Sequence, residues 1–276
     1  MRIISLTTIP PRFAMLGPTL ASLLRQKEPA DRILLYVPRY YRRFPGYGGG
    51  LPEVPAGIEI RRPETDYGPA SKVLHALRDF GGTGTEILFC DDDRKYYPGW
   101  SRIFWRARTE RPDDAIAPIS WEASKFFDST QASRRQPRAV ERNRKRDWRW
   151  QIEDAIWQVK DLVGPKTEGP SPRLIARAGY RDIFQGYGGV LVRPGFFDAD
   201  VFAIPDVLWA VDDIWLSGML AKAGTGVWAP ANVKGPRLTR AHDAAPLYRA
   251  TIDGADRRSA DIACFNHMRE TYGLWP

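Results

Sequence analysis

Ile87-Leu88-Phe89-Cys90-Asp91-Asp92-Asp93 joins four consecutive apolar residues to three consecutive aspartates. The apolar run predicts a buried strand, so the acids lie at its C-terminal end, where open α/β sheets place their ligands. Three adjacent carboxylates repel one another, and a divalent cation with oxygen ligands, such as Mg²⁺ or Mn²⁺, would relieve that repulsion. A solvated acidic turn is the alternative, and the rest of the chain has to distinguish the two.

The composition is that of an ordinary globular protein, with 276 residues, 43% of them hydrophobic and 27% charged. No apolar run is long enough to predict a membrane span, and the apolar start of the chain is too short for a secretory signal. Cys90 and Cys264 have no metal-ligand spacing, and nothing suggests a disulfide framework, which favours a reducing compartment. The net charge of +8 favours anionic partners: sugar nucleotides, acidic glycans, anionic lipid or nucleic acid.

Strand-like and helix-like patterns alternate along the first hundred residues. We expect strands at 3–7, 33–37, 58–60 and 87–90, and helices with one apolar face at 16–24 and 69–80. This alternation predicts an α/β fold with a mostly parallel central sheet flanked by helices. Later patterns predict strands at 115–119, 188–192 and 226–229, and helices at 212–223 and 260–272.

An irregular basic insertion is expected at about 125–175, where the periodicity fades. Residues 134–149 carry eight basic and only two acidic side chains. The stretch has three functional interpretations: a mobile loop that closes on a diphosphate, a patch for anionic lipid, or a surface for an acidic glycan. Trp148 and Trp150 favour lipid slightly, whereas no nucleic-acid motif accompanies the stretch. A solvated charged helix is the plain alternative.

Three segments, taken in order, resemble those of sugar-nucleotide glycosyltransferases with the GT-A fold. Ser5–Arg12 resembles the opening of many such enzymes, Asp91 and Asp93 resemble their D-x-D motif, and Asp212-Asp213-Ile214 resembles the segment that carries the base in inverting members. The resemblance covers roughly 1–120 and 185–245. It implies one Rossmann-like domain over 1–276, with a nucleotide-binding half at about 1–120, the insertion, and an acceptor and catalytic half at about 176–276.

The resemblance implies that nucleotide is bound after the first, third and fourth strands. The chemistry suits this role, because hydroxyls can bind base or ribose, a tyrosine ring can stack on uracil, and basic side chains can bind phosphate. The plain alternatives are a strand-ending turn, a helix cap and a solvated surface lysine. The expected nucleotide-binding residues are Thr7, Thr8, Ile9, Arg12, Asp66, Tyr67, Lys72, Asp91 and Asp92.

For the metal, the resemblance implies direct contact by Asp93, with Asp91 binding either metal or ribose. Asp92 has no secure role. His242 lies where some family members place a histidine that completes the metal site, with an ordinary loop histidine as the alternative. His267 on the terminal helix is its rival, and His75 is interpreted as structural. The cofactor expected is Mn²⁺ or Mg²⁺, which would stabilise the departing diphosphate.

Asp212 and Asp213 are the expected catalytic residues. By position in the motif, Asp213 is interpreted as the base that deprotonates the acceptor hydroxyl, and Asp212 as an orienting group. Acids stabilised by the dipole at a helix N-terminus are the alternative. Gly188, Gly189 and Trp209 are expected near the sugar or acceptor, although a tight turn and a buried core tryptophan would explain them equally well.

The chain is therefore predicted to be a metal-dependent glycosyltransferase that inverts the configuration at the anomeric carbon of the transferred sugar. Retention of that configuration is the alternative. The donor is a nucleoside diphosphate sugar, with UDP favoured by family frequency, and the acceptor is a hydroxyl of a glycan or glycolipid. Surface polysaccharide or lipopolysaccharide assembly at the cytoplasmic side, with peripheral contact to anionic membrane, is the expected setting. A non-catalytic sugar or nucleotide binder and a related nucleotidyltransferase are the alternatives. Arg94-Lys95 argue against a haloacid-dehalogenase-type phosphatase.

Overall fold

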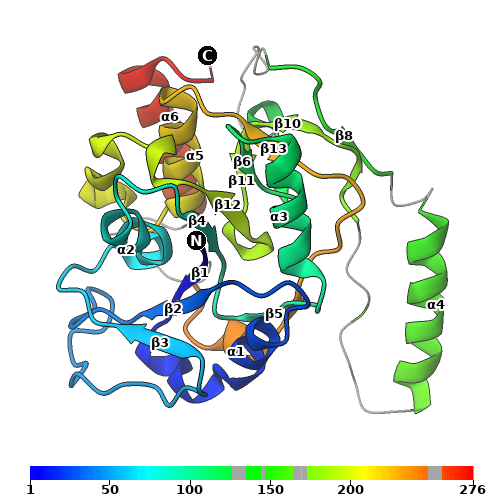
Figure 1. Ribbon diagram of the computed structural model, residues 1–276, viewed down its shortest axis with the longest axis horizontal. Coiled ribbons are helices and arrows are strands. Elements are labelled where there is room, and N and C mark those ends of the chain that lie inside the picture. The colour runs from blue at the N-terminus through cyan, green and yellow to red at the C-terminus, as the bar shows by residue number, and fades with distance from the viewer. Residues whose placement is uncertain (126–134, 144–146, 164–168, 170–172, 248–256, 276) are drawn as a thin grey trace.

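The computed structural model describes residues 1–125, 135–143, 147–163, 169, 173–247 and 257–275 (Figure 1). An eight-stranded mixed sheet forms its centre, in the order β10-β13-β6-β12-β4-β1-β2-β3. The strands are β1 (Arg2–Thr7), β2 (Arg32–Tyr36), β3 (Ile58–Arg61), β4 (Glu86–Phe89), β6 (Ala115–Ile116), β10 (Gly179–Arg181), β12 (Val190–Val192) and β13 (Val227–Ala229). The first four pair in parallel, whereas β12 is antiparallel to both neighbours.

Helices cover both faces of this sheet, because the apolar strand residues alternate between two cores. Ile3, Ile87 and Phe89 belong to one core, with α2 (Ser71–Asp79), α5 (Asp212–Lys222) and α6 (Arg257–Tyr272). Ile4 and Leu88 belong to the other core, with α1 (Gly17–Leu24) and α3 (Trp100–Glu110). The predicted α/β class, with a mostly parallel sheet flanked by helices, is confirmed.

Three two-stranded ribbons connect distant parts of the chain. β5 (Arg94–Lys95) pairs with β14 (Arg237–Leu238), β7 (Ser120–Trp121) with β11 (Ile183–Phe184), and β8 (Val140–Glu141) with β9 (Ile175–Arg177). The first ribbon matters most for the site. It brings the segment that leads to His242 beside the strand that follows the three aspartates.

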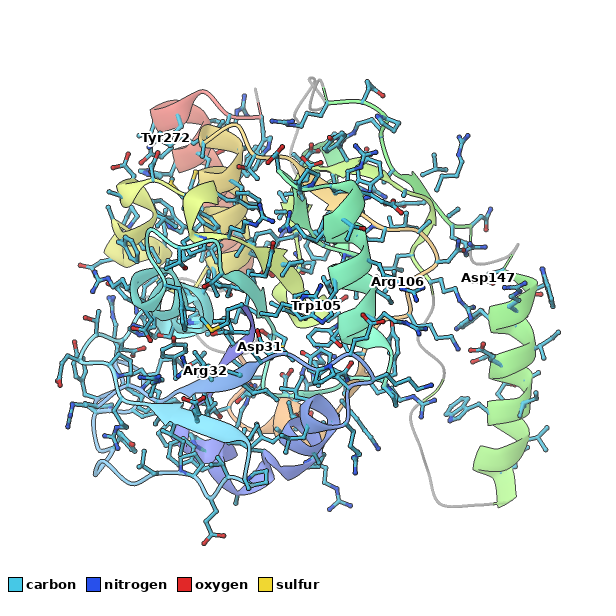
Figure 2. All side chains as sticks on the ribbon, viewed as in Figure 1. Asp31, Arg32, Trp105, Arg106, Asp147 and Tyr272 are labelled. Atoms are coloured by element: carbon cyan, nitrogen blue, oxygen red, sulfur yellow. The ribbon has the colours of Figure 1, made fainter. Side chains whose placement is uncertain are left out.

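The basic insertion contains a helix, α4 (Trp148–Val163), that lies at the edge of the molecule (Figure 1). Figure 2 marks Asp147 just before its first turn. Of the basic stretch, residues 134 and 144–146 lie outside the described residues. No helix within the described ranges combines the length and the apolar character needed to cross a bilayer.

The carboxyl ends of β1 and β4 meet at a point where the strand order reverses. From β1 the chain passes to β2 on one side, whereas β4 pairs with β1 on the other side. The loops that leave the two strands therefore lie at the edge where open α/β sheets place their ligands. The loop after β1 is Thr8–Arg12, and the loop after β4 holds Asp91, Asp92 and Asp93.

Candidate functional site

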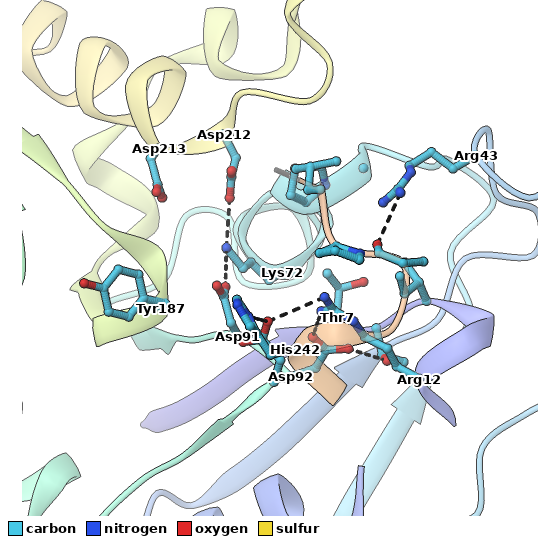
Figure 3. A pocket seen from close by; sticks show the side chains of 18 of the residues that line it. Thr7, Arg12, Arg43, Lys72, Asp91, Asp92, Tyr187, Asp212, Asp213 and His242 are labelled. Atoms are coloured by element: carbon cyan, nitrogen blue, oxygen red, sulfur yellow. Dashed lines mark hydrogen bonds and ion pairs between the residues drawn. The ribbon is translucent and has the colours of Figure 1, made fainter. Parts of the chain in front are cut away.

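A cavity of about 510 Å³ opens at this edge of the sheet (Figure 3). Its walls come from the loops after β1 and β4, the starts of α2 and α5, and the segment 242–247. A cavity of this size suits a small organic ligand. Most of the predicted site residues line it: Thr7, Thr8, Ile9, Arg12, Asp66, Lys72, Asp91, Asp92, Asp93, Trp209, Asp212, Asp213 and His242.

Lys72 on α2 lies between two carboxylates from different elements. Its Nζ is 2.5 Å from Asp91 Oδ1 and 2.8 Å from Asp212 Oδ2. Burial alone would lower the pKa of Lys72, but the charges of Asp212, Asp91 and Asp213 raise it well above the usual value. Burial likewise favours protonated Asp91, yet Lys72 holds the pKa of that carboxyl below its usual range. Lys72 therefore stays charged and links the D-x-D segment to α5.

Asp92 turns away from its neighbours and fixes the loop after β1. Thr8 Oγ1 donates to Asp92 Oδ2 over 2.6 Å, and Arg12 Nη1 donates to Asp92 Oδ1 over 2.6 Å. Thr19 Oγ1 also donates to the Asp92 carbonyl over 2.8 Å. Burial raises the pKa of this carboxyl to about 6, although Arg12 opposes the shift. Asp92, the middle acid, thus has a structural role: it holds the loop after β1 against the loop that contains Asp91 and Asp93.

Asp93 and His242 form the pair best suited to hold a metal ion. Asp93 Oδ2 lies 3.1 Å from His242 Nδ1, and Asp93 Oδ1 is buried without a hydrogen bond to any described residue. No three histidine, cysteine, aspartate or glutamate side chains of the described part come together as a complete metal site. The pair fits Mg²⁺ or Mn²⁺, since such ions bind through one or two protein ligands and take the rest from phosphate and water.

Basic side chains already neutralise part of the acid triplet. Arg12 Nη2 lies 3.5 Å from Asp93 Oδ2, and Arg94 Nε lies 3.2 Å from Asp93 Oδ1. The repulsion noted from the sequence is therefore relieved partly within the protein. Seven aspartates nevertheless line the cavity, against four side chains of arginine or lysine. An anionic diphosphate would meet this acidic surface at a cost, which an added cation would reduce.

The two acids at the start of α5 differ in their surroundings. Asp212 is buried and paired with Lys72. Asp213 is more exposed, lines the cavity, and accepts a hydrogen bond from Gly186 N over 2.9 Å through Oδ1. Both lie in the first helical turn, as expected. The carboxylate of Asp213 is therefore the more accessible of the two to a molecule bound in the cavity.

Asp66, one of the residues predicted to bind nucleotide, makes local backbone contacts. Its Oδ1 accepts from Gly68 N and its Oδ2 from Arg42 N, each over 2.8 Å. Burial raises its pKa, while these two hydrogen bonds oppose the rise. The structure places Tyr67 in the core and not among the cavity-lining residues. Its ring lies 5.1 Å from that of His75, because the chain turns at Gly68 before α2 begins.

The three residues expected near the sugar have different positions. Trp209 lines the cavity, but its ring covers Gly68 so closely that a Cβ there would come within 2.7 Å of it. Gly188 and Gly189 lie behind the cavity wall, where added Cβ atoms would meet Ile119 and Trp100. These glycines therefore permit close core packing. Gly189, with a φ of 90°, ends the short 3₁₀ turn Gly186–Gly188, which agrees with the tight turn that the sequence left open as the alternative.

Several lining residues were not predicted from the sequence. Arg94 stacks over the ring of Tyr187, with 4.6 Å from its guanidinium carbon to the ring centroid. The Gly186-Tyr187-Gly188-Gly189 sequence indicated a loop near the site, but not that the tyrosine faces the cavity. Arg94 directly follows the three aspartates, and this position was the only feature of the sequence that could have indicated Arg94 as a lining residue. Other unpredicted members are Tyr41, Arg43, Phe44, Trp121, Gln185 and Asp261.

Comparison with known proteins gives no family for this chain. No family model matches it, and no curated protein does. Among solved structures, S. aureus TarS 1-349 shares 14% sequence identity with this chain at a TM-score of 0.43. The match covers 98% of this chain and 72% of the TarS chain. The same TarS segment in complex with UDP shares 13% identity at 0.44. A longer TarS structure shares 12% identity at 0.45, with 43% of that chain covered.

Proposed function

We propose that this protein is a glycosyltransferase that moves a sugar from a nucleoside diphosphate to an acceptor hydroxyl. One observation carries the proposal. Acids from the end of β4 and from the start of α5 face one cavity at the strand-order reversal, and buried Lys72 joins them. Transfer with inversion needs these two parts, a site for the diphosphate and a base for the acceptor, on opposite sides of the reacting carbon.

The lining residues have separate tasks in this reaction. The loop Thr7–Arg12 and Asp66 border the space for the nucleoside, and Arg12, Lys72 and Arg94 provide positive charge for the phosphates. Asp213 accepts the proton of the acceptor hydroxyl as its oxygen attacks the anomeric carbon. The bond from that carbon to the diphosphate oxygen breaks with its electron pair leaving on the diphosphate. The product sugar then has the inverted configuration.

A divalent cation, Mn²⁺ or Mg²⁺, would be held by Asp93 and His242, with Asp91 nearby, and would supply charge stabilisation to the leaving diphosphate. We favour UDP as the nucleotide. A glycan or glycolipid is the proposed acceptor, in the assembly of surface polysaccharide on the cytoplasmic side of a membrane. Support for this last assignment comes only from the sequence resemblance.

Calorimetric titration with UDP, GDP, CDP and TDP, each with and without Mn²⁺, tests the donor site. We expect one nucleotide to bind at least about tenfold more tightly with metal. The corresponding sugar nucleotides, incubated with the enzyme, should then release that nucleoside diphosphate slowly to water and faster with an acceptor. If no nucleoside diphosphate binds under either condition, the proposed function fails.

A further inference from the structure

The helix α4 presents its apolar side chains to solvent. Trp148, Ile152, Ile156, Val159 and Leu162 are 61%, 51%, 52%, 63% and 84% exposed. Their spacing of three and four residues places them on one face of the helix. Apolar residues this exposed are normal when scattered singly, but a continuous row marks a contact surface. We call these five residues the outer face of α4.

Polar contacts, by contrast, attach α4 to the body of the protein. Glu153 accepts from Lys234 over 2.6 Å and from Arg173 over 3.1 Å. Asp147, which immediately precedes the helix, is buried near Arg142 and Arg173 (Figure 2). A surface helix of a globular protein normally turns its apolar stripe inward and its charges outward. In α4 the apolar row formed by the outer face is turned to solvent, while Trp150, Glu153 and Trp157 lie partly buried on the opposite side, where the ion pairs of Glu153 hold the helix in place.

The chain that leads into α4 is basic by sequence and favours an anionic partner, although Arg138 and Arg142 pair with acids of the protein itself. The sequence 134–149, which runs into the helix, has eight basic and two acidic residues, a net charge of +6 within a chain of net charge +8. Arg149 is exposed beside the outer face, with its guanidinium carbon 5.2 Å from the ring centroid of Trp148. An apolar helical face bordered by tryptophan and arginine is the pattern of helices that lie in the headgroup region of a bilayer.

We infer that the outer face of α4 binds the surface of a membrane that contains anionic lipid. The helix would lie in the plane of the interface, with its apolar side chains among the acyl chains and the basic residues at the headgroups. A second copy of this chain is the competing occupant, and the outer face of α4 alone is a small contact for a stable dimer, because its five side chains come from one helix of 16 residues.

Sedimentation of the full chain with vesicles tests this inference without reference to activity. The vesicles contain phosphatidylcholine alone, or phosphatidylcholine with about 30% phosphatidylglycerol. We expect the protein to pellet with the anionic vesicles and much less with the neutral ones. The double variant Ile152→Gln/Val159→Gln removes apolar surface without changing charge, and should weaken binding at least about tenfold.

A matched control distinguishes binding through the outer face of α4 from nonspecific binding of exposed apolar side chains to vesicles. Leu51 and Ile262, far from α4 in sequence, are 49% and 41% exposed. Leu51→Gln/Ile262→Gln should bind the anionic vesicles within about twofold of the unchanged protein. Circular dichroism confirms that both double variants are folded, as expected for exposed positions.

Three results would overturn the inference. The first is no pelleting with either kind of vesicle. The second is equal binding by Ile152→Gln/Val159→Gln and the unchanged protein, which would show that the outer face of α4 does not contribute to vesicle binding. The third comes from sedimentation velocity in the absence of lipid. A dimer that this double variant converts to a monomer would show that the face joins two copies of the chain.

Discussion

Lys72 on α2 forms a buried ion pair with Asp212 on α5, with 2.8 Å between Nζ and Oδ2, and the same ammonium group contacts Asp91. Two carboxylates thus depend on one cation that is itself almost fully buried. Removing one partner from such a group leaves uncompensated charge in a medium that solvates it poorly. We predict that Lys72→Met lowers the free energy of unfolding by about 3–5 kcal/mol, as measured by urea denaturation.

Lys222 offers the matched control, because it also contacts two aspartates, Asp198 and Asp200, but at the protein surface. Lys222→Met should leave the urea midpoint nearly unchanged. Equal midpoints for Lys72→Met and the unchanged protein would show that water or rearrangement solvates Asp91 and Asp212. The proposed link between the two sides of the cavity would then carry no stability.

The second prediction concerns Asp213. Asp213→Asn retains an Oδ1 acceptor for Gly186 N but cannot take a proton from the acceptor hydroxyl. We expect sugar transfer to fall by about 10²–10⁴-fold, with the affinity for the nucleoside diphosphate unchanged. Rate and binding assays on the same preparation check both parts. Transfer near the normal rate would remove Asp213 as the base and favour the alternative of a helix N-terminal acid.

The third prediction concerns the metal. Asp93→Asn and His242→Gln should each weaken the Mn²⁺-dependent part of nucleotide binding by more than the roughly 10–100-fold typical of outer-shell partners. Asp243→Asn serves as the control, because Asp243 adjoins His242 but does not line the cavity. Titration of nucleotide in Mn²⁺ and in chelator gives the two affinities. Tight binding that chelator leaves unchanged would mean that Arg12, Lys72 and Arg94 carry the diphosphate without metal.

The sequence was sufficient to predict the sheet and the edge that holds the site. Strands such as Ile87–Cys90 are buried on both faces and therefore appear as continuous apolar runs. The chemistry-bearing residues directly follow them, and parallel strands bring their carboxyl ends to one edge. This is why Arg12, Asp91 and Asp93 could be placed at one edge of the sheet from the order of strands, whereas the distant Asp213 was assigned to the same site only through the resemblance to GT-A glycosyltransferases.

The features that the sequence did not reveal depend on the directions of side chains and on contacts between elements that are distant in the sequence. Lys72 was expected to reach phosphate, but its ion pair with Asp212 requires α2 and α5 to be close. The direction of Tyr67 depends on its packing in the core, where its ring lies 5.1 Å from that of His75. The apolar spacing in α4 has the same period whether the face points inward or outward. The exposure of the five apolar side chains and the ion pairs of Glu153 on the other side show which way it points.

The last prediction is a pH dependence that arises outside the cavity. His75 is buried between the rings of Tyr36 and Tyr67, at centroid distances of 5.4 and 5.1 Å, and burial lowers its pKa to about 4. In the unfolded chain a histidine has a pKa of about 6.5, so between these values the unfolded state binds a proton that the folded state does not. Stability from neutral His75 is thus complete above about pH 6.5 and is lost as the pH falls toward 4.

His75→Phe keeps a ring in place without a titrating group. From pH 7.5 to 5 it should lose about 2 kcal/mol less unfolding free energy than the unchanged protein, as measured by urea denaturation. Parallel losses would show that His75 is protonated within the fold.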